Sequence, residues 1–109
     1  MTRIEFFNPS DDRIEGFCSS GHSGYAEEGE DIVCAAISAA VNLTITTITD
    51  VMGVKAKVKV NEEAARITLK LPVSCEEQED AVQDILAGLM LYLCSLRDDY
   101  PTFIEVMEV

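Results

Sequence analysis

The sequence contains no tryptophan, a single histidine and few basic residues. Eight Lys and Arg stand against twenty Asp and Glu, which gives a formal charge of -12. A chain of this charge repels a phosphate backbone, so we expect no nucleic-acid partner. The same field attracts a basic peptide or protein, although an acidic surface can also serve solubility alone.

The four cysteines include no Cys-x-x-Cys pair; they are Cys18, Cys34, Cys75 and Cys94. Closely spaced pairs are typical of zinc sites, and disulfide frameworks belong to secreted chains. We therefore expect reduced thiols, no metal and no cofactor. A weaker alternative is a metal held by Cys18, His22 and Cys34.

No basic region followed by an apolar stretch opens the chain, so we expect no signal peptide and a cytoplasmic protein. The longest uncharged run, Ile32 to Thr49, is close to the roughly 17 to 25 residues of a membrane helix. Polar residues interrupt this run and no Lys or Arg cluster flanks it. The pattern favours a buried helix over a membrane segment.

The length predicts a single domain over residues 1–109. Hydrophobic residues make up 48% of the chain and charged residues 26%, which is typical of a globular protein with a modest core. Neither an internal repeat nor a linker divides it.

Alternating apolar and polar residues predict two hairpins. Residues 1–20 form the first, and residues 54–71 form the second, with one face in water. A last strand follows Pro101; its apolar face is either Phe103, Val106 and Val109, or Ile104 and Val106.

Two helices separate these strands. Asp31 is a candidate N-cap for the first helix, whose apolar circumference requires cover on several sides. The second helix shows apolar residues at helical spacing from Val82 to Leu96, and Ser74 with Glu77 fits a capping box before it. The order ββαββαβ predicts an α+β fold with both helices packed on a largely antiparallel sheet.

His22 is the only side chain whose unperturbed pKa lies near neutrality, and it sits where the second strand meets a glycine-rich loop. Cys34 follows in the first turn of the predicted helix. A loop that doubles back would bring the two together, and helix N-termini favour ionised thiols. The alternative is a packed Cys34 and an exposed loop histidine.

At these residues the chain resembles a known family. The motif Gly21-His22-Ser23-Gly24-Tyr25-Ala26, with Gly29 and Asp31-Ile32-Val33-Cys34-Ala35-Ala36 followed by Ser38, is similar to the ribosomal-processing cysteine proteases of bacteria, the Prp family. The similarity is dense over residues 21–38 and looser elsewhere. Ser23 stands where alanine is more usual.

The resemblance implies a homodimeric cysteine endopeptidase that removes a short N-terminal extension from ribosomal large-subunit protein twenty-seven. It implies that His22 and Cys34 are catalytic and that Gly21, Asp31 and Ser38 support them. The partner is then a basic ribosomal protein.

The mechanism that we expect uses His22 as the base and the Cys34 thiolate as the nucleophile. Backbone N–H groups around residues 33–35 would bind the oxyanion. Asp31 either caps the helix or orients His22, and Ser38 either contacts substrate or bonds its own helix backbone. The substrate lid is expected in the loop residues Ser23, Gly24, Tyr25 and Gly29.

Two other classes stay open. One is a noncatalytic acidic homodimeric module that binds a basic ribosomal or other protein, with Cys34 only packed. The other is a redox sensor, which would oxidise Cys34 reversibly and release no peptide.

Overall fold

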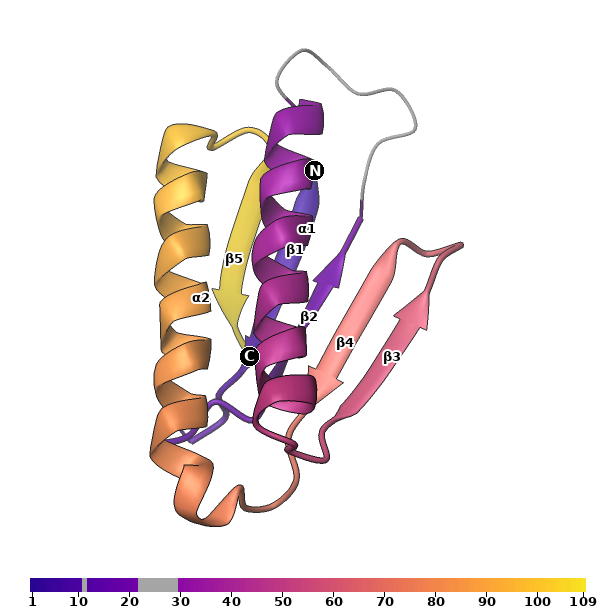
Figure 1. Ribbon diagram of the computed structural model, residues 1–109. Coiled ribbons are helices and arrows are strands. Elements are labelled where there is room, and N and C mark those ends of the chain that lie inside the picture. The colour runs from indigo at the N-terminus through magenta and orange to yellow at the C-terminus, as the bar shows by residue number, and fades with distance from the viewer. Residues whose placement is uncertain (11, 22–29) are drawn as a thin grey trace.

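The computed structural model describes residues 1–10, 12–21 and 30–109, with their side chains except those of Glu30 and Asp31. Its elements follow the predicted order (Figure 1): β1 Thr2–Phe7, β2 Gly16–Ser20, α1 Glu30–Thr46, β3 Lys57–Asn61, β4 Arg66–Lys70, α2 Glu79–Asp99 and β5 Ile104–Glu108. A π-helical turn extends α1 over Thr47–Val51, and a 3-10 turn over Glu76–Gln78 leads into α2.

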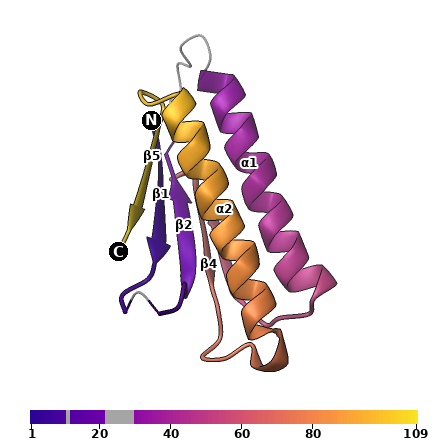
Figure 2. The ribbon, with the colours of Figure 1, turned by 90° about the vertical axis from the view of Figure 1, so that its left-hand side faces the viewer.

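The strands form one sheet in the order β3-β4-β2-β1-β5. β1 pairs with β5 in parallel, and the other neighbours are antiparallel. Both helices lie on one face of this sheet (Figure 2). The α+β prediction, with two helices on a largely antiparallel sheet, is confirmed. No described element covers the other face, which we call the open face.

Alternation along the strands sends one set of side chains under the helices. Ile4 and Phe6 of β1, Phe17 of β2 and Leu69 of β4 have no exposed surface. Phe6, Phe17 and Leu69 share one row of the sheet, and the two rings lie 6.0 Å apart between centroids. The hairpin predicted over residues 1–20 therefore supplies the centre of the core.

β5 resolves the alternative left open for the last strand. Ile104 pairs with Thr2 and Val106 with Ile4, so these two residues share the helix-covered face. Ile104 is 2% exposed. Phe103 precedes the strand, and its carbonyl accepts the Thr2 N–H at 3.0 Å.

α1 is covered over only part of its circumference. Val33 and Ile37 are buried against the sheet, whereas Ile32 and Leu43 are 67% and 68% exposed. The segment Ile32–Val51 has the length and apolar composition of a membrane span, and 28% of its apolar window is buried. The prediction that this helix is covered on several sides is wrong for the described chain, because the sheet and α2 reach only part of its surface.

The β3–β4 hairpin extends beyond α1 (Figure 1). Every residue of β3 is exposed, and Val58 and Val60 are exposed by 38% and 63%. The alternation that predicts an apolar face is present here, but no helix reaches far enough to bury it.

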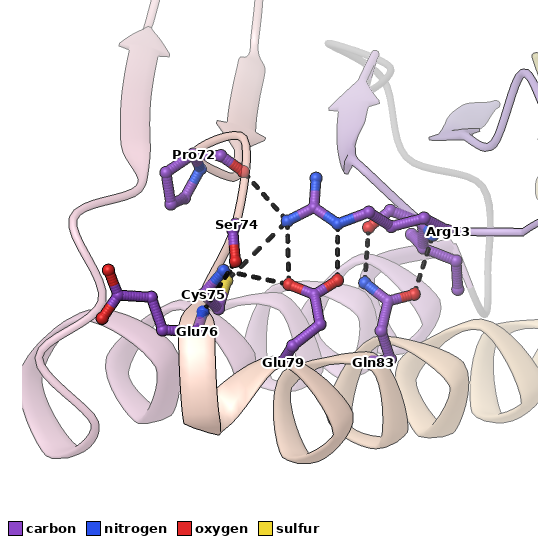
Figure 3. Close-up of polar contacts among 8 residues, drawn as sticks. Arg13, Pro72, Ser74, Cys75, Glu76, Glu79 and Gln83 are labelled. Atoms are coloured by element: carbon purple, nitrogen blue, oxygen red, sulfur yellow. Dashed lines mark hydrogen bonds and ion pairs between the residues drawn. The ribbon is translucent and has the colours of Figure 1, made fainter.

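Arg13 ties the link between β1 and β2 to the start of α2 (Figure 3). Its Nε donates to Glu79 Oε2 at 2.6 Å, and its Nη2 donates to Glu79 Oε1 at 3.1 Å and to the Pro72 carbonyl at 2.9 Å. Gln83 adds two bonds of 2.8 Å with the backbone N–H and carbonyl of Ile14. This cluster fixes α2 along the sheet.

The capping box predicted between Ser74 and Glu77 does not form. Ser74 Oγ accepts from the Glu76 N–H at 2.9 Å, while Glu79 Oε1 accepts from the Cys75 N–H at 3.0 Å. The 3-10 turn delays the start of α2, so Glu79 takes the role predicted for Glu77. Glu76 adopts a φ of 55° at this turn.

We predict that Glu79 makes folding stability depend on acid. The hydrogen bond from Arg13, together with that from the Cys75 N–H, lowers the pKa of Glu79 from 4.5 to about 2. A depressed pKa stabilises the fold above about pH 4.5, and this contribution is lost as the pH falls toward 2. Glu79→Gln should lower the free energy of unfolding at pH 7 by about 2 kcal/mol.

Urea unfolding at pH 7 and pH 3 measures this effect. The wild-type chain should lose more stability between these pH values than Glu79→Gln loses. Glu77→Gln is the matched control, because the Glu77 side chain makes no hydrogen bond in the described part of the chain. Parallel pH curves for all three proteins would contradict the assignment.

Candidate functional site

Cys34 lines a groove of about 270 Å³ at the end of the molecule where β2 finishes and α1 starts. One wall is α1, with Ile37 and Val41 beyond the thiol. The other is formed by the ends of the strands, including Val60 and Ile67. We call this hollow the Cys34 groove. Its lining is mixed: apolar side chains alternate with polar groups near the thiol, and Asn42, Asn61 and Arg66 lie further along it.

The hydroxyl of Thr2 is the polar group beside Cys34. Thr2 is 4% exposed, and its Oγ1 lies 3.8 Å from Cys34 Sγ. The same hydroxyl donates to the Gly21 carbonyl at 3.2 Å, so the thiol can donate to the free lone pair of Oγ1. One side chain therefore bridges the first strand, the end of β2 and α1.

Gly21 requires glycine for two reasons. Its φ of 92° lies in the region that residues with a Cβ avoid, and an added Cβ would lie 2.8 Å from the Met1 carbonyl oxygen. Its N–H donates to the Ala65 carbonyl at 3.1 Å. The predicted supporting residue thus lies in the Cys34 groove. Its hydrogen bonds with Thr2 and Ala65 hold the backbone in place just after the end of β2.

Ser38 lies in the same groove, one helical turn after Cys34. Its hydroxyl makes no hydrogen bond within the described residues, whereas Thr44, further along the same helix, donates to the Ala40 carbonyl at 2.9 Å. The alternative in which Ser38 bonds its own helix backbone is not observed. No described residue occupies its hydroxyl, which faces the groove.

The start of α1 differs from the prediction. The helix begins at Glu30, so Asp31 lies inside the first turn rather than before it, and Cys34 lies in the second turn. The unpaired N–H groups of a helix are those of its first four residues, here 30–33. The Cys34 N–H is inside the helical ladder, so of the N–H groups predicted to bind the oxyanion, those around residues 33–35, only that of residue 33 is left unpaired by the helix.

Five predicted residues lie outside the described part of the chain: His22, Ser23, Gly24, Tyr25 and Gly29. The side chain of Asp31 is also outside it. The predicted contact of His22 with Cys34 and the predicted lid stay predictions. What is described is the residue before His22, and it lies in the groove.

The other cysteines are separated from this groove. Burial, with the nearby Glu79 carboxylate, raises the pKa of the Cys75 thiol, which keeps it protonated. Cys18 pairs with Glu5 and Thr68 on the open face, on the opposite side of the sheet from Cys34. A single metal ion cannot take both Cys18 and Cys34 as ligands, and the described residues contain no cluster of metal-ligating side chains.

Sequence reasoning missed Thr2, Asn42 and Asn61 as groove residues. A signal for Thr2 was present. The alternation of Ile4 and Phe6 on the buried face, continued two residues back, places a hydroxyl at the end of an apolar row. Asn42 and Asn61 gave no signal, because their proximity depends on how far α1 extends over the β3–β4 hairpin.

The sequence of this chain matches a known protein family. The sequence profile of the family described as cysteine protease Prp matches residues 1–105. The ribosomal processing cysteine protease Prp of Bacillus subtilis (strain 168) is 26% identical over 97 residues, which are 88% of this chain and 87% of the relative.

Solved structures share the fold over the whole chain. The essential ribosomal processing protease Prp from S. aureus in complex with a substrate peptide has a TM-score of 0.87 at 17% identity, with full coverage of both chains. The same protein with a covalently linked product peptide has a TM-score of 0.83 at 18% identity and full coverage. SMU.848 from Streptococcus mutans has a TM-score of 0.87 at 21% identity and is covered over 94% of its length.

We predict that Thr2 positions the Cys34 thiol and stabilises its ionised form. When the thiol ionises, the Thr2 hydroxyl can turn from the Gly21 carbonyl to the sulfur, because a charged acceptor binds a donor more strongly than a neutral one. Thr2→Val should slow alkylation of Cys34 by iodoacetamide at pH 7 by about fivefold, since one hydrogen bond is worth roughly 1 kcal/mol. Thr2→Ser should retain most of the wild-type rate. A Thr2→Val rate equal to that of the wild type would overturn the role.

Proposed function

This chain belongs to the family of the cysteine protease Prp, and from that premise we propose that it removes a short N-terminal extension from ribosomal large-subunit protein twenty-seven. In this proposal His22 and Cys34 form the catalytic pair. The reaction takes place in the cytoplasm, where ribosomal proteins are made, and uses no cofactor.

The observation that supports this pair is the double contact of Thr2. Its hydroxyl lies within 3.2 Å of the Gly21 carbonyl oxygen and 3.8 Å of Cys34 Sγ. His22 follows Gly21 directly in the chain, and Gly21 lines the groove that contains Cys34. A loop histidine far from Cys34 would not require this arrangement of the preceding residue.

The proposed reaction begins when an imidazole nitrogen of His22 takes the proton from Cys34 Sγ. The thiolate attacks the scissile carbonyl, and the C–N bond breaks as His22 returns the proton to the leaving amine. Water then attacks the thioester carbonyl while His22 accepts a proton from it; the C–S bond breaks, the carboxylic acid product leaves, and His22 returns the proton to Cys34 Sγ. Thr2 donates a hydrogen bond to the sulfur while it is negative.

The start of α1 can stabilise the second negative charge of this reaction, the oxyanion that forms on the scissile carbonyl. A helical side chain leans toward the N-terminus, so the Cys34 sulfur lies over the turn that contains residues 30–33. The unpaired N–H groups of that turn can donate to an oxyanion formed next to the sulfur. Because Asp31 is within the turn, we assign it to orienting His22 rather than to capping. Asp31→Asn should then reduce turnover with little loss of stability.

The Cys34 groove is suited to an extended peptide with apolar side chains. Ile37, Val41 and Ile67 supply apolar contacts, and Ser38 offers a hydroxyl for the peptide backbone. The charge of -12 favours encounter with a basic ribosomal protein. In this proposal the lid over the bound segment comprises Ser23, Gly24, Tyr25 and Gly29, which lie outside the described residues.

We also propose that the chain forms a homodimer through the uncovered sides of α1 and α2. A groove of about 540 Å³ lies between the helices, lined by Ala36, Ala39 and Leu43 of α1 and by Gly88 and Tyr92 of α2, among others. Small residues let a second pair of helices approach closely. A second copy, carrying the same apolar surface, is the occupant that covers it by symmetry.

We predict that Leu43→Glu converts the dimer to a monomer. A buried carboxylate opposite its own symmetry mate has no partner, so the interface should be lost. Analytical ultracentrifugation measures the mass. Val73→Glu is the matched control, because Val73 is 98% exposed and lies outside this groove. A dimer that survives Leu43→Glu would place the interface elsewhere.

The function is tested with ribosomal protein twenty-seven from the same organism. We expect the wild-type chain to remove a defined N-terminal fragment, seen by intact mass, and Cys34→Ala and His22→Ala to leave the substrate whole. The substrate must carry an extension, and each variant must show the unfolding midpoint of the wild type.

Labelling with iodoacetamide distinguishes the protease from the noncatalytic binding module. A catalytic Cys34 should react faster than Cys75, and more slowly in His22→Ala. No cleavage, together with equal labelling in both proteins, would instead support a noncatalytic binding module.

A further inference from the structure

The positive charge of this acidic chain is concentrated in one hairpin. Residues 55–70 hold five of the eight basic residues and only two of the twenty acidic residues. The rest of the chain therefore carries a formal charge of -15. Net charge alone conceals a local surface of the opposite sign.

Four of these basic residues share the open face of the sheet. Lys57 pairs with Lys70, and Asn61 pairs with Arg66, across the β3–β4 ladder. Lys59 lies between them and is paired with Thr68. Because Leu69 faces the helices, its neighbours on β4 at alternate positions face the other way. We call the surface of Lys57, Lys59, Arg66 and Lys70 the cationic face.

The arrangement costs stability. Like charges directly opposite each other on paired strands repel, and Lys57 and Lys70 are such a pair. Lysines on β3 alone would be explained by protection of an edge strand against aggregation. That explanation does not extend to Lys70 and Arg66, because β4 is paired on both sides.

The cationic face is hollowed and lacks counter-charges. A groove of about 690 Å³ is lined by its four cations together with Asn61, Thr68 and Val60. None of the four cations makes an ion pair with a residue in the described ranges. The Lys70 ammonium lies 5.7 Å from the centre of the Phe7 ring, which leaves it able to bind an anion.

We propose that the cationic face binds the phosphodiester backbone of single-stranded RNA without base preference. Lysine, arginine, threonine and asparagine are the side chains that contact phosphates, and the first two are regularly spaced along the strands here. An acidic peptide is less favoured, because the groove offers no apolar pocket for an anchoring side chain. Val60 lines this groove, but its side chain points to the helix side of the sheet and so provides no apolar pocket here.

The overall charge does not prevent this contact. The acidic residues of the second helix lie on the other side of the sheet from the cationic face (Figure 2). At physiological ionic strength the screening length is about 8 Å, so separated charges interact weakly. The repulsion keeps the affinity modest and leaves it strongly dependent on salt.

The test measures the anisotropy of a labelled short oligouridine with the full chain carrying Cys34→Ala, so that binding is independent of proteolysis. Four phosphate contacts predict that the logarithm of the association constant falls with the logarithm of salt concentration with a slope of about -3. Lys59→Gln should weaken binding roughly fourfold at about 0.15 M salt and reduce the slope by about 0.7. Arg97→Gln is the matched control, because it removes one positive charge on α2.

The outcomes decide between the alternatives. A loss for Lys59→Gln without a loss for Arg97→Gln supports the cationic face. Equal losses would show that binding follows net charge, which overturns the proposal. Binding of an oligoglutamate peptide in place of RNA would assign the face to an acidic protein. Binding of neither would overturn the proposal.

Discussion

The burial of one stripe of α1 against the sheet determines how the rest of the molecule is placed. Val33, Ile37 and Val41 recur at helical spacing and are 1%, 3% and 2% exposed. Their burial fixes the rotation of the helix about its axis. Cys34 and Ser38, each one residue further along the chain, are then set beside the buried stripe, facing the groove rather than the core or the solvent. A rotation of the helix that exposed Val33 would also move the thiol away from Thr2.

The same stripe explains why apolar side chains stay exposed in two places, at the β3 edge of the sheet and on the outer sides of the helices. The sheet is wider than the pair of helices, so the edge strand β3 is left without a helical layer. The helices also carry more apolar surface than one face of the sheet can bury. Folding alone does not explain either feature, whereas the proposed peptide groove and the proposed subunit interface would each use one of them.

Local patterns in the sequence predicted the elements well, and contacts between distant segments could not be predicted. The alternation around Ile4 and Phe6 and the helical spacing from Val82 to Leu96 each depend on residues a few positions apart, so they identified hairpins and helices. The parallel pairing of β1 with β5 joins the two ends of the chain and has no local signal. The Thr2 contact with Cys34 depends on that pairing and on the position of α1. Glu79, rather than the predicted Glu77, accepts the Cys75 N–H. This replacement depends on the single turn in which Glu76 adopts a φ of 55°.

The chain order of the sheet has a consequence for biosynthesis. Thr2, which contacts the thiol, is held by its N–H bond to the Phe103 carbonyl, and β1 pairs with β5, about 100 residues further along the chain. A nascent polypeptide whose C-terminal end is still inside the ribosomal exit tunnel cannot supply that strand. The contact of Thr2 with Cys34 is therefore held in place only after residues 103–108 have left the tunnel and paired with β1.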